Sequence, residues 1–137
     1  MARTRIVFMS RADVPVRRAL QEAIDRLGFR LTLDDAYAPF ETAGYLPCTL
    51  DGEDAGFDLR FQDVRADVSP ALRAAIGDRD VAIAFRWAGD PREELAALAV
   101  CIALVADFGA LVCERERDEV LSSSELLAEA RVVQTTL

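Results

Sequence analysis

The chain has 137 residues, a length that fits one domain, and 52% of them are hydrophobic. Its net charge is −8, and all 16 basic residues are arginine, with no lysine, histidine or asparagine. Such an acidic chain repels phosphates and anionic lipid, so we expect a protein with a basic surface as its partner, and no nucleic acid or membrane. The N-terminal segment lacks the apolar stretch of a signal peptide, and we expect a cytoplasmic protein.

The first third of the chain predicts a strand, a helix and a strand. Residues 5–9 form a short apolar run, which is typical of a strand buried on both faces. A helix follows, with Asp13 as its N-cap and apolar residues at helical spacing from Val16 to Leu27. Residues 29–34 alternate between apolar and polar side chains, which predicts a strand with one face in water.

A loop and a hairpin are predicted next. Residues 34–45 show no hydrophobic period and predict a loop. The segments 45–50 and 57–61 then flank the sequence DGEDAG (51–56), and this pattern indicates a β-hairpin. That turn lacks the ligand order of a calcium loop, so we expect it to be a solvated turn.

The second half of the chain begins with a short helix between Ser69 and Gly77, followed by an alternating strand over 81–87. A longer helix is predicted from the N-cap Asp90 to about Phe108. This helix is apolar nearly all round, but its apolar part is shorter than the roughly 20 residues of a membrane span. We therefore expect a buried core helix.

The C-terminal part predicts a strand over 110–116, a turn at 117–118, a short strand, and a helix that starts at a capping box of Ser122 and Glu125. The whole order predicts one α+β domain over residues 1–137. We expect a two-layer sandwich, ferredoxin-like or related, with a mixed or antiparallel sheet, two β-α-β units and a β-hairpin. A homodimer stays open, because the 29–34 or 111–116 strand could lie at a sheet edge.

The composition excludes much enzyme chemistry. Without histidine there is no imidazole base and no zinc site of the usual kinds, and without lysine there is no Schiff base and no P-loop. The cysteines Cys48, Cys101 and Cys113 form no C-x-x-C motif and are expected to be small buried hydrophobes. We therefore expect no enzyme, no cofactor and no metal site.

The loop and the hairpin turn supply the first candidate site. Aromatic side chains are interleaved with acids in the loop, a composition that matches a hot spot for a basic partner, and the hairpin turn adds further acids. An alternative is that Phe40 and Tyr45 pack beneath the loop as part of the core. The expected partner-binding residues are Asp34, Asp35, Tyr37, Phe40, Glu41, Tyr45, Asp51, Glu53 and Asp54.

The segment FRWAGD supplies a second candidate site. Arg86 and Trp87 end a strand, and Asp90 starts the next helix, which is a place where anionic ligands often bind. The alternative is structural: Trp87 closes the core and Arg86 pairs with an acid such as Asp90.

The segments ETAGYLPCTLDGEDAGFDLRF and FRWAGD, together with small size, acidity and the missing catalytic set, resemble bacterial immunity proteins, the antidotes encoded beside toxins. The resemblance implies tight binding in which an acidic face occludes the active site of a toxin. It carries over no functional residue. Three other functions stay open: a regulatory module that binds an anionic ligand at Arg86, an enzyme that uses carboxylates, and a structural role in an assembly.

Overall fold

The computed structural model describes residues 3–65, 67–114 and 119–137. Its main sheet contains β1 (Arg3–Met9), β3 (Ala43–Leu46), β6 (Phe57–Asp63), β7 (Val81–Trp87), β8 (Leu111–Glu114) and β9 (Glu119–Leu121). A smaller sheet contains β2 (Leu31–Leu33), β4 (Cys48–Leu50) and β5 (Glu53–Asp54). The helices are the 3-10 turn η1 (Arg11–Asp13), α1 (Arg17–Arg26), α2 (Pro70–Ile76), α3 (Pro91–Phe108) and α4 (Ser123–Gln134).

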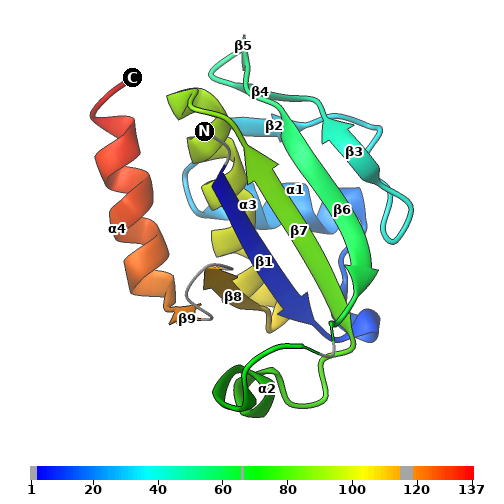
Figure 1. Cartoon of the computed structure of the whole chain (residues 1–137). Coiled ribbons are helices and arrows are strands. Elements are labelled where there is room, and N and C mark those ends of the chain that lie inside the picture. Colours follow the sequence, from blue (N-terminus) through cyan, green and yellow to red (C-terminus); the bar gives the residue numbers. More distant parts are fainter. Residues whose placement is uncertain (1–2, 66, 115–118) are drawn as a thin grey trace.

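The main sheet is antiparallel throughout its described strands, in the order β3-β6-β7-β1-β8-β9. Its four central strands and the helices α1 and α3 form a β-α-β-β-α-β core of ferredoxin-like order. The helices α1 and α3 lie behind the sheet in Figure 1, with α4 beside them. The predicted two-layer α+β sandwich is confirmed.

The strand that completes the first β-α-β unit differs from the prediction. Residues 29–34 were expected to return to the sheet of the first strand, but β2 begins at Leu31 and pairs with β4 in the smaller sheet, order β2-β4-β5. Strand β6 takes its place, because its seven residues can pair with β7 along most of their length while β2 has three.

The hairpin is confirmed, and it is one continuous ladder shared by the two sheets. Leu46 pairs with Phe57 in the main sheet, and Leu50 pairs with Glu53 in the smaller sheet, in the same register. Asp51 and Gly52 join the arms and both have positive φ, 53° and 83°. Positive φ at both residues of a two-residue loop is the type I′ turn, for which Asp-Gly is a favoured sequence.

Helix α3 is the centre of the core, as expected. The side chain of Asp90 caps it by accepting a 2.8 Å hydrogen bond from the Arg92 N–H, and Gly109 ends it in the left-handed conformation. Every residue from Leu95 to Leu104 is buried, because the sheet, α1, α4 and β4 all pack against this helix. None of the helices in the described ranges is long and apolar enough to cross a membrane.

The predicted start of α1 is wrong. Asp13 lies in the turn η1, and the helix begins at Arg17 with Val16 as its N-cap. Val16 is 62% exposed, so it does not belong to the apolar face of the helix. Pro15 explains the shift, because a residue before proline is held out of the helical conformation and the chain stays extended there.

The second face of the main sheet carries a separate apolar cluster. Ile6 and Phe8 of β1 point to this face and pack against Leu72 and Ile76 of α2, which folds across one end of the sheet (Figure 1). The strand predicted over 110–116 is described only as β8, and its residues 115–116 and the turn at 117–118 lie outside the described residues. Strand β8 is not an edge, because β9 pairs with its outer side.

Candidate functional site

Two of the predicted partner-binding segments meet in one surface depression. Asp34 and Asp35 follow the end of β2, and Asp54 ends β5 on the hairpin, yet all three line a depression of about 400 Å³. Thr32 and Thr49 supply hydroxyl groups to its wall. All three carboxylates are exposed, so their charge acts on the solvent side of the smaller sheet.

Asp54 also borders a second depression, at the tip of the hairpin. This shallow space of about 420 Å³ is lined by Glu53, Asp54, Asp90 and Arg92, because the hairpin tip lies beside the start of α3. We call the two depressions together the acidic band. Its charged residues are the carboxylates Asp34, Asp35, Glu53, Asp54 and Asp90 and the guanidinium groups Arg17 and Arg92.

The two arginines of the acidic band are already engaged. Arg17 Nε donates to the Leu33 carbonyl at 3.0 Å and lies 3.4 Å from a carboxylate oxygen of Asp35. Arg92 Nε lies 2.6 Å from Glu53. The band therefore carries five carboxylates against two guanidinium groups that are held in place, and it has an excess of negative charge.

The acidic band also acts on neighbouring groups that titrate. Burial raises the pKa of the Cys48 thiol to about 12, and the negative charge of Asp34 adds to this effect. The pKa of the Tyr45 hydroxyl is raised first by partial burial and then by the charges of Glu93 and Asp54. Tyr45 therefore lies within the negative potential of the hairpin tip.

Tyr45 is a predicted contact residue that remains accessible. Its side chain is 63% exposed, although its ring lies directly over Gly56 of the opposite hairpin arm. A β-carbon placed on Gly56 would overlap the Tyr45 hydroxyl, which no two such atoms can do. Glycine at 56 thus leaves room for the hydroxyl end of the Tyr45 side chain.

Other predicted contact residues lie elsewhere. Tyr37 is buried, and its hydroxyl donates to the Pro15 carbonyl at 2.9 Å, so it is a core residue and no surface contact. Phe40 is 37% exposed and packs between the guanidinium group of Arg11 and the ring of Phe61. Tyr37 thus packs beneath the loop, and Phe40 does so in part. For Phe40, packing beneath the loop was the alternative that the sequence left open.

Two further acids of that prediction also lie outside the acidic band. Glu41 is exposed in the loop two residues before β3, and Asp51 lies near Arg30 at the hairpin turn, with 3.9 Å between the charged atoms. The band thus contains four of the predicted acids, Asp34, Asp35, Glu53 and Asp54, and adds Asp90 from the second predicted site.

The second predicted site does not converge. Arg86 and Trp87 are neighbours in β7, so their side chains point to opposite faces of the sheet. Trp87 is 3% exposed and donates from its indole nitrogen to Glu94 at 3.1 Å, whereas Arg86 is exposed on the other face. Asp90 caps α3, and Arg86 forms no ion pair with Asp90 or with any other described residue.

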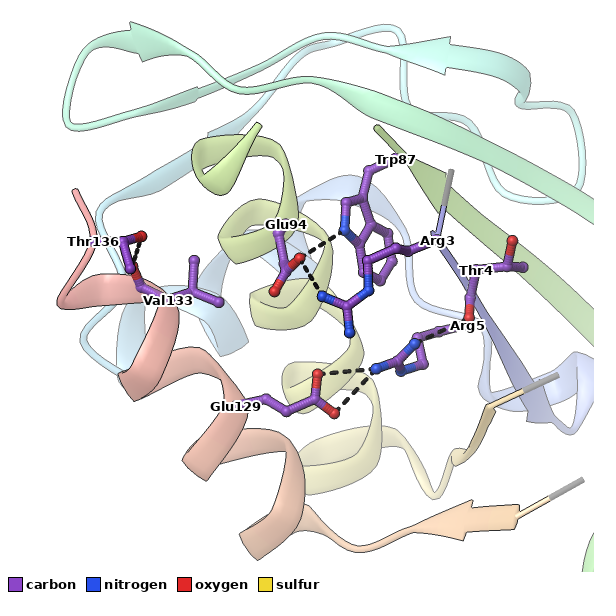
Figure 2. A network of polar contacts seen from close by, with 8 residues as sticks. All are labelled: Arg3, Thr4, Arg5, Trp87, Glu94, Glu129, Val133 and Thr136. Carbon is purple, nitrogen blue, oxygen red and sulfur yellow. Dashed lines mark hydrogen bonds and ion pairs between the residues drawn. The ribbon is translucent and has the colours of Figure 1, made fainter. Parts of the chain in front are cut away.

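A polar network on the helix side of β1 was missed by the sequence analysis. Figure 2 shows Arg5 reaching Glu129 of α4 with two hydrogen bonds, of 2.9 and 3.1 Å, while Arg3 bonds to Glu94 at 2.8 Å. Arg5 is 3% exposed and lies 5.7 Å from the Trp87 ring. The alternation of side chains along a strand could have revealed this network, because it places Arg3 and Arg5 on the same side of β1 as the buried Val7 and Met9.

The three cysteines do not lie together with the described acids in a cluster of metal-ligand type. All three cysteines are buried, and burial raises the pKa of Cys101 far above its ordinary value. Within the described ranges no group of three or more cysteines and acids could hold a metal ion. A pocket of about 270 Å³ beside α2 is lined by Gln62, Arg65 and Asp67 together with apolar side chains such as Ile6, Phe8 and Leu72.

Comparison of the chain with protein-family models, with curated proteins and with solved structures finds no match.

Proposed function

We propose that this protein binds a basic protein partner through the acidic band, in the cytoplasm, and that the partner is a bacterial toxin whose active site it occludes. One observation carries the proposal. The carboxylates of Asp34 and Asp35, from one loop, and of Asp54, from the hairpin, line a single depression, and Arg17 is the only cation among the described residues that line it. Two segments that are distant in the sequence thus present one negative surface.

The acidic band suits recognition better than catalysis. Its carboxylates are exposed, and exposed charges chiefly increase the rate of encounter and select partners of the opposite charge. The hydroxyls of Thr32 and Thr49 add neutral hydrogen-bonding groups between the charges. An enzyme active site that binds an anionic substrate would accept the same pattern, because clustered carboxylates imitate that substrate.

The second candidate, a small anionic ligand held by Arg86, has less support. A ligand at Arg86 would lie on the opposite face of the sheet from Trp87, and Asp90 would add a negative charge near the start of α3. A thermal melting screen against nucleotides and metabolites addresses it directly. A ligand that raises the melting temperature of the wild type but not of Arg86→Ala would favour this function.

The test of the main proposal is capture of the partner on the immobilised protein from cells of the source organism, with quantitative mass spectrometry. The wild type is compared with a band variant that carries Asp34→Asn, Asp35→Asn and Asp54→Asn. The matched control carries Asp13→Asn, Asp63→Asn and Asp78→Asn, which changes the net charge equally at the other end of the sheet, away from β5 (Figure 1).

We expect one basic protein in stoichiometric amount on the wild type and on the control variant, and its loss from the band variant. Equal retention by all three proteins would show that the acidic band is not the binding surface. Equal loss from both variants would show that only the net charge matters.

A further inference from the structure

The first arm of the hairpin has an outer edge that is paired along only part of its length. Phe61 N donates to the Thr42 carbonyl, and Ala55 N donates to the Cys48 carbonyl, in one register. Hydrogen-bonded pairs alternate in an antiparallel ladder, so the even-numbered residues of this arm bond to the second arm. The odd-numbered residues, from Ala43 to Asp51, therefore direct their backbone groups outward.

Strand β2 covers the part of this edge that lies nearest the turn. Thr32 pairs with Thr49, Asp51 N donates to the Arg30 carbonyl at 2.9 Å, and Asp34 N donates to the Pro47 carbonyl at 3.2 Å. After Asp34 the chain turns away. The N–H and C=O groups of Ala43 and Tyr45, further along the same edge, have no hydrogen-bond partner within the described ranges.

We propose that an extended basic segment of the partner protein adds to the sheet along β3, with backbone hydrogen bonds to Ala43 and Tyr45. Strand addition of this kind uses the main chain for affinity and neighbouring side chains for selectivity. The inference rests on the proposed function and deepens it, because it names the form in which the partner binds.

Charge decides which occupant this edge suits. Asp34 and Asp35 stand where β2 ends, and Glu41 stands two residues before Ala43, so acids flank the open edge at both ends. A basic segment would place its cations near these groups. A second copy of this chain would instead bring another net charge of −8 to the same edge, which opposes pairing.

The outer edge of β2 itself offers no such place. The side-chain amide of Gln21 accepts from Leu33 N at 2.8 Å and donates to the Leu31 carbonyl at 2.7 Å, as a neighbouring strand would. Arg17 donates to the Leu33 carbonyl as well. The homodimer considered for the 29–34 strand would have to displace both side chains.

The test uses a synthetic peptide of alternating lysine and valine, seven residues long and capped at both ends, as the probe. A second peptide has the same sequence with every backbone amide N-methylated, so it keeps the charges but donates no hydrogen bond from its main chain. Binding to the full chain is followed by NMR, through the amide signals of Ala43 and Tyr45 and through dissociation constants.

Two protein variants test the same backbone hydrogen bonds by changing the protein instead of the peptide. Ala43→Pro removes an outward N–H and leaves the bonds to β6 intact, and Ala43→Val keeps that N–H as the matched control. We expect Ala43→Pro to weaken binding of the unmodified peptide about five- to tenfold and Ala43→Val less than about twofold. The methylated peptide should bind weakly to every variant.

Each other outcome has a distinct meaning. If both peptides bind equally and only Asp35→Asn with Asp54→Asn weakens them, strand addition is wrong and the acidic band stands. If neither peptide binds at low salt, both the inference and the proposed function fail. If the wild type dimerises with rising concentration and Ala43→Pro abolishes this, the edge belongs to a second copy.

Discussion

Arg5, on the central strand, and Glu129, on α4, form a two-bond ion pair in which the arginine is 3% exposed and the carboxylate side chain 30%. The Nε atom of Arg5 is buried and has no hydrogen-bond partner among the described residues, so the two bonds to Glu129 supply most of the compensation for burying its guanidinium charge. We expect Glu129→Ala to lower the free energy of unfolding by about 2–4 kcal/mol, because it leaves a buried charge unpaired.

The matched control for this prediction is the double variant Arg5→Met with Glu129→Leu, measured by urea unfolding. Replacing both partners removes the charge together with its carboxylate, and the double variant should be more stable than Glu129→Ala. A double variant that is less stable than Glu129→Ala would show that the pair itself stabilises the fold by a large net amount.

Gln21 is predicted to protect the edge of β2 from other strands. Gln21→Leu leaves Leu33 N and the Leu31 carbonyl unbonded, and we expect a loss of about 1–3 kcal/mol in unfolding free energy and self-association at high concentration. Gln21→Glu is the control, since it can still accept from Leu33 N. Chromatography and sedimentation should show Gln21→Leu as the more associated variant, and equal behaviour of the two would contradict this role.

Gly56 is predicted to tolerate no side chain while Tyr45 lies over it. We expect Gly56→Ala to destabilise the protein by about 1–3 kcal/mol, because the added carbon would meet the Tyr45 ring. Tyr45→Ala in the same chain should recover part of this loss only, since the Leu46 carbonyl would still lie 2.7 Å from that carbon. Thermal unfolding of the two variants measures the difference, and no recovery would place the clash at the backbone alone.

The stability of the fold should fall at alkaline pH. Burial raises the pKa of Cys48 from 9.0 to about 12, so the folded state holds a proton that the unfolded state releases. The stabilisation is complete below pH 9.0 and is lost as pH rises toward 12, by about 1.4 kcal/mol per thiol at pH 10. Cys101 acts in the same direction.

The check is urea unfolding of the wild type and of Cys48→Ala at pH 8 and pH 10. The difference in unfolding free energy between the two pH values should be smaller in the variant by about 1.4 kcal/mol. An unchanged difference would mean that Cys48 does not keep its proton in the folded state.

Local patterns predicted most of the elements. The capping box of Ser122 and Glu125, the hairpin around the sequence DGEDAG and the apolar length of α3 each depend on residues close in the chain, and all three appear as expected. The position of β2 depended on competition between β2 and β6 for the edge of β7, which no local pattern records. The start of α1 was misplaced because Asp13 was taken as the N-cap, whereas Val14, the residue before Pro15, stays extended.

The candidate site was predicted only in part, because it also depends on contacts between residues that are distant in the sequence. Asp34, Asp35 and Asp54 were named from composition, but their meeting in one depression follows from the pairing of β2 with β4. Tyr37 was named for its residue type, and its burial against Pro15 is a tertiary contact. The sequence analysis treated Arg5 only as the first residue of the apolar run 5–9, and its pairing could not be foreseen because its partner Glu129 lies 124 positions away.

The most direct test of the central claim is the association rate of the captured partner with the wild type, the band variant and the matched control, measured at low and at physiological salt. We predict that the wild type and the control lose about tenfold in rate between the two salt conditions, because exposed charges steer the encounter. The band variant should associate more slowly at low salt and depend less on salt. Equal rates and equal salt dependence for all three proteins would contradict a role for Asp34, Asp35 and Asp54 in binding.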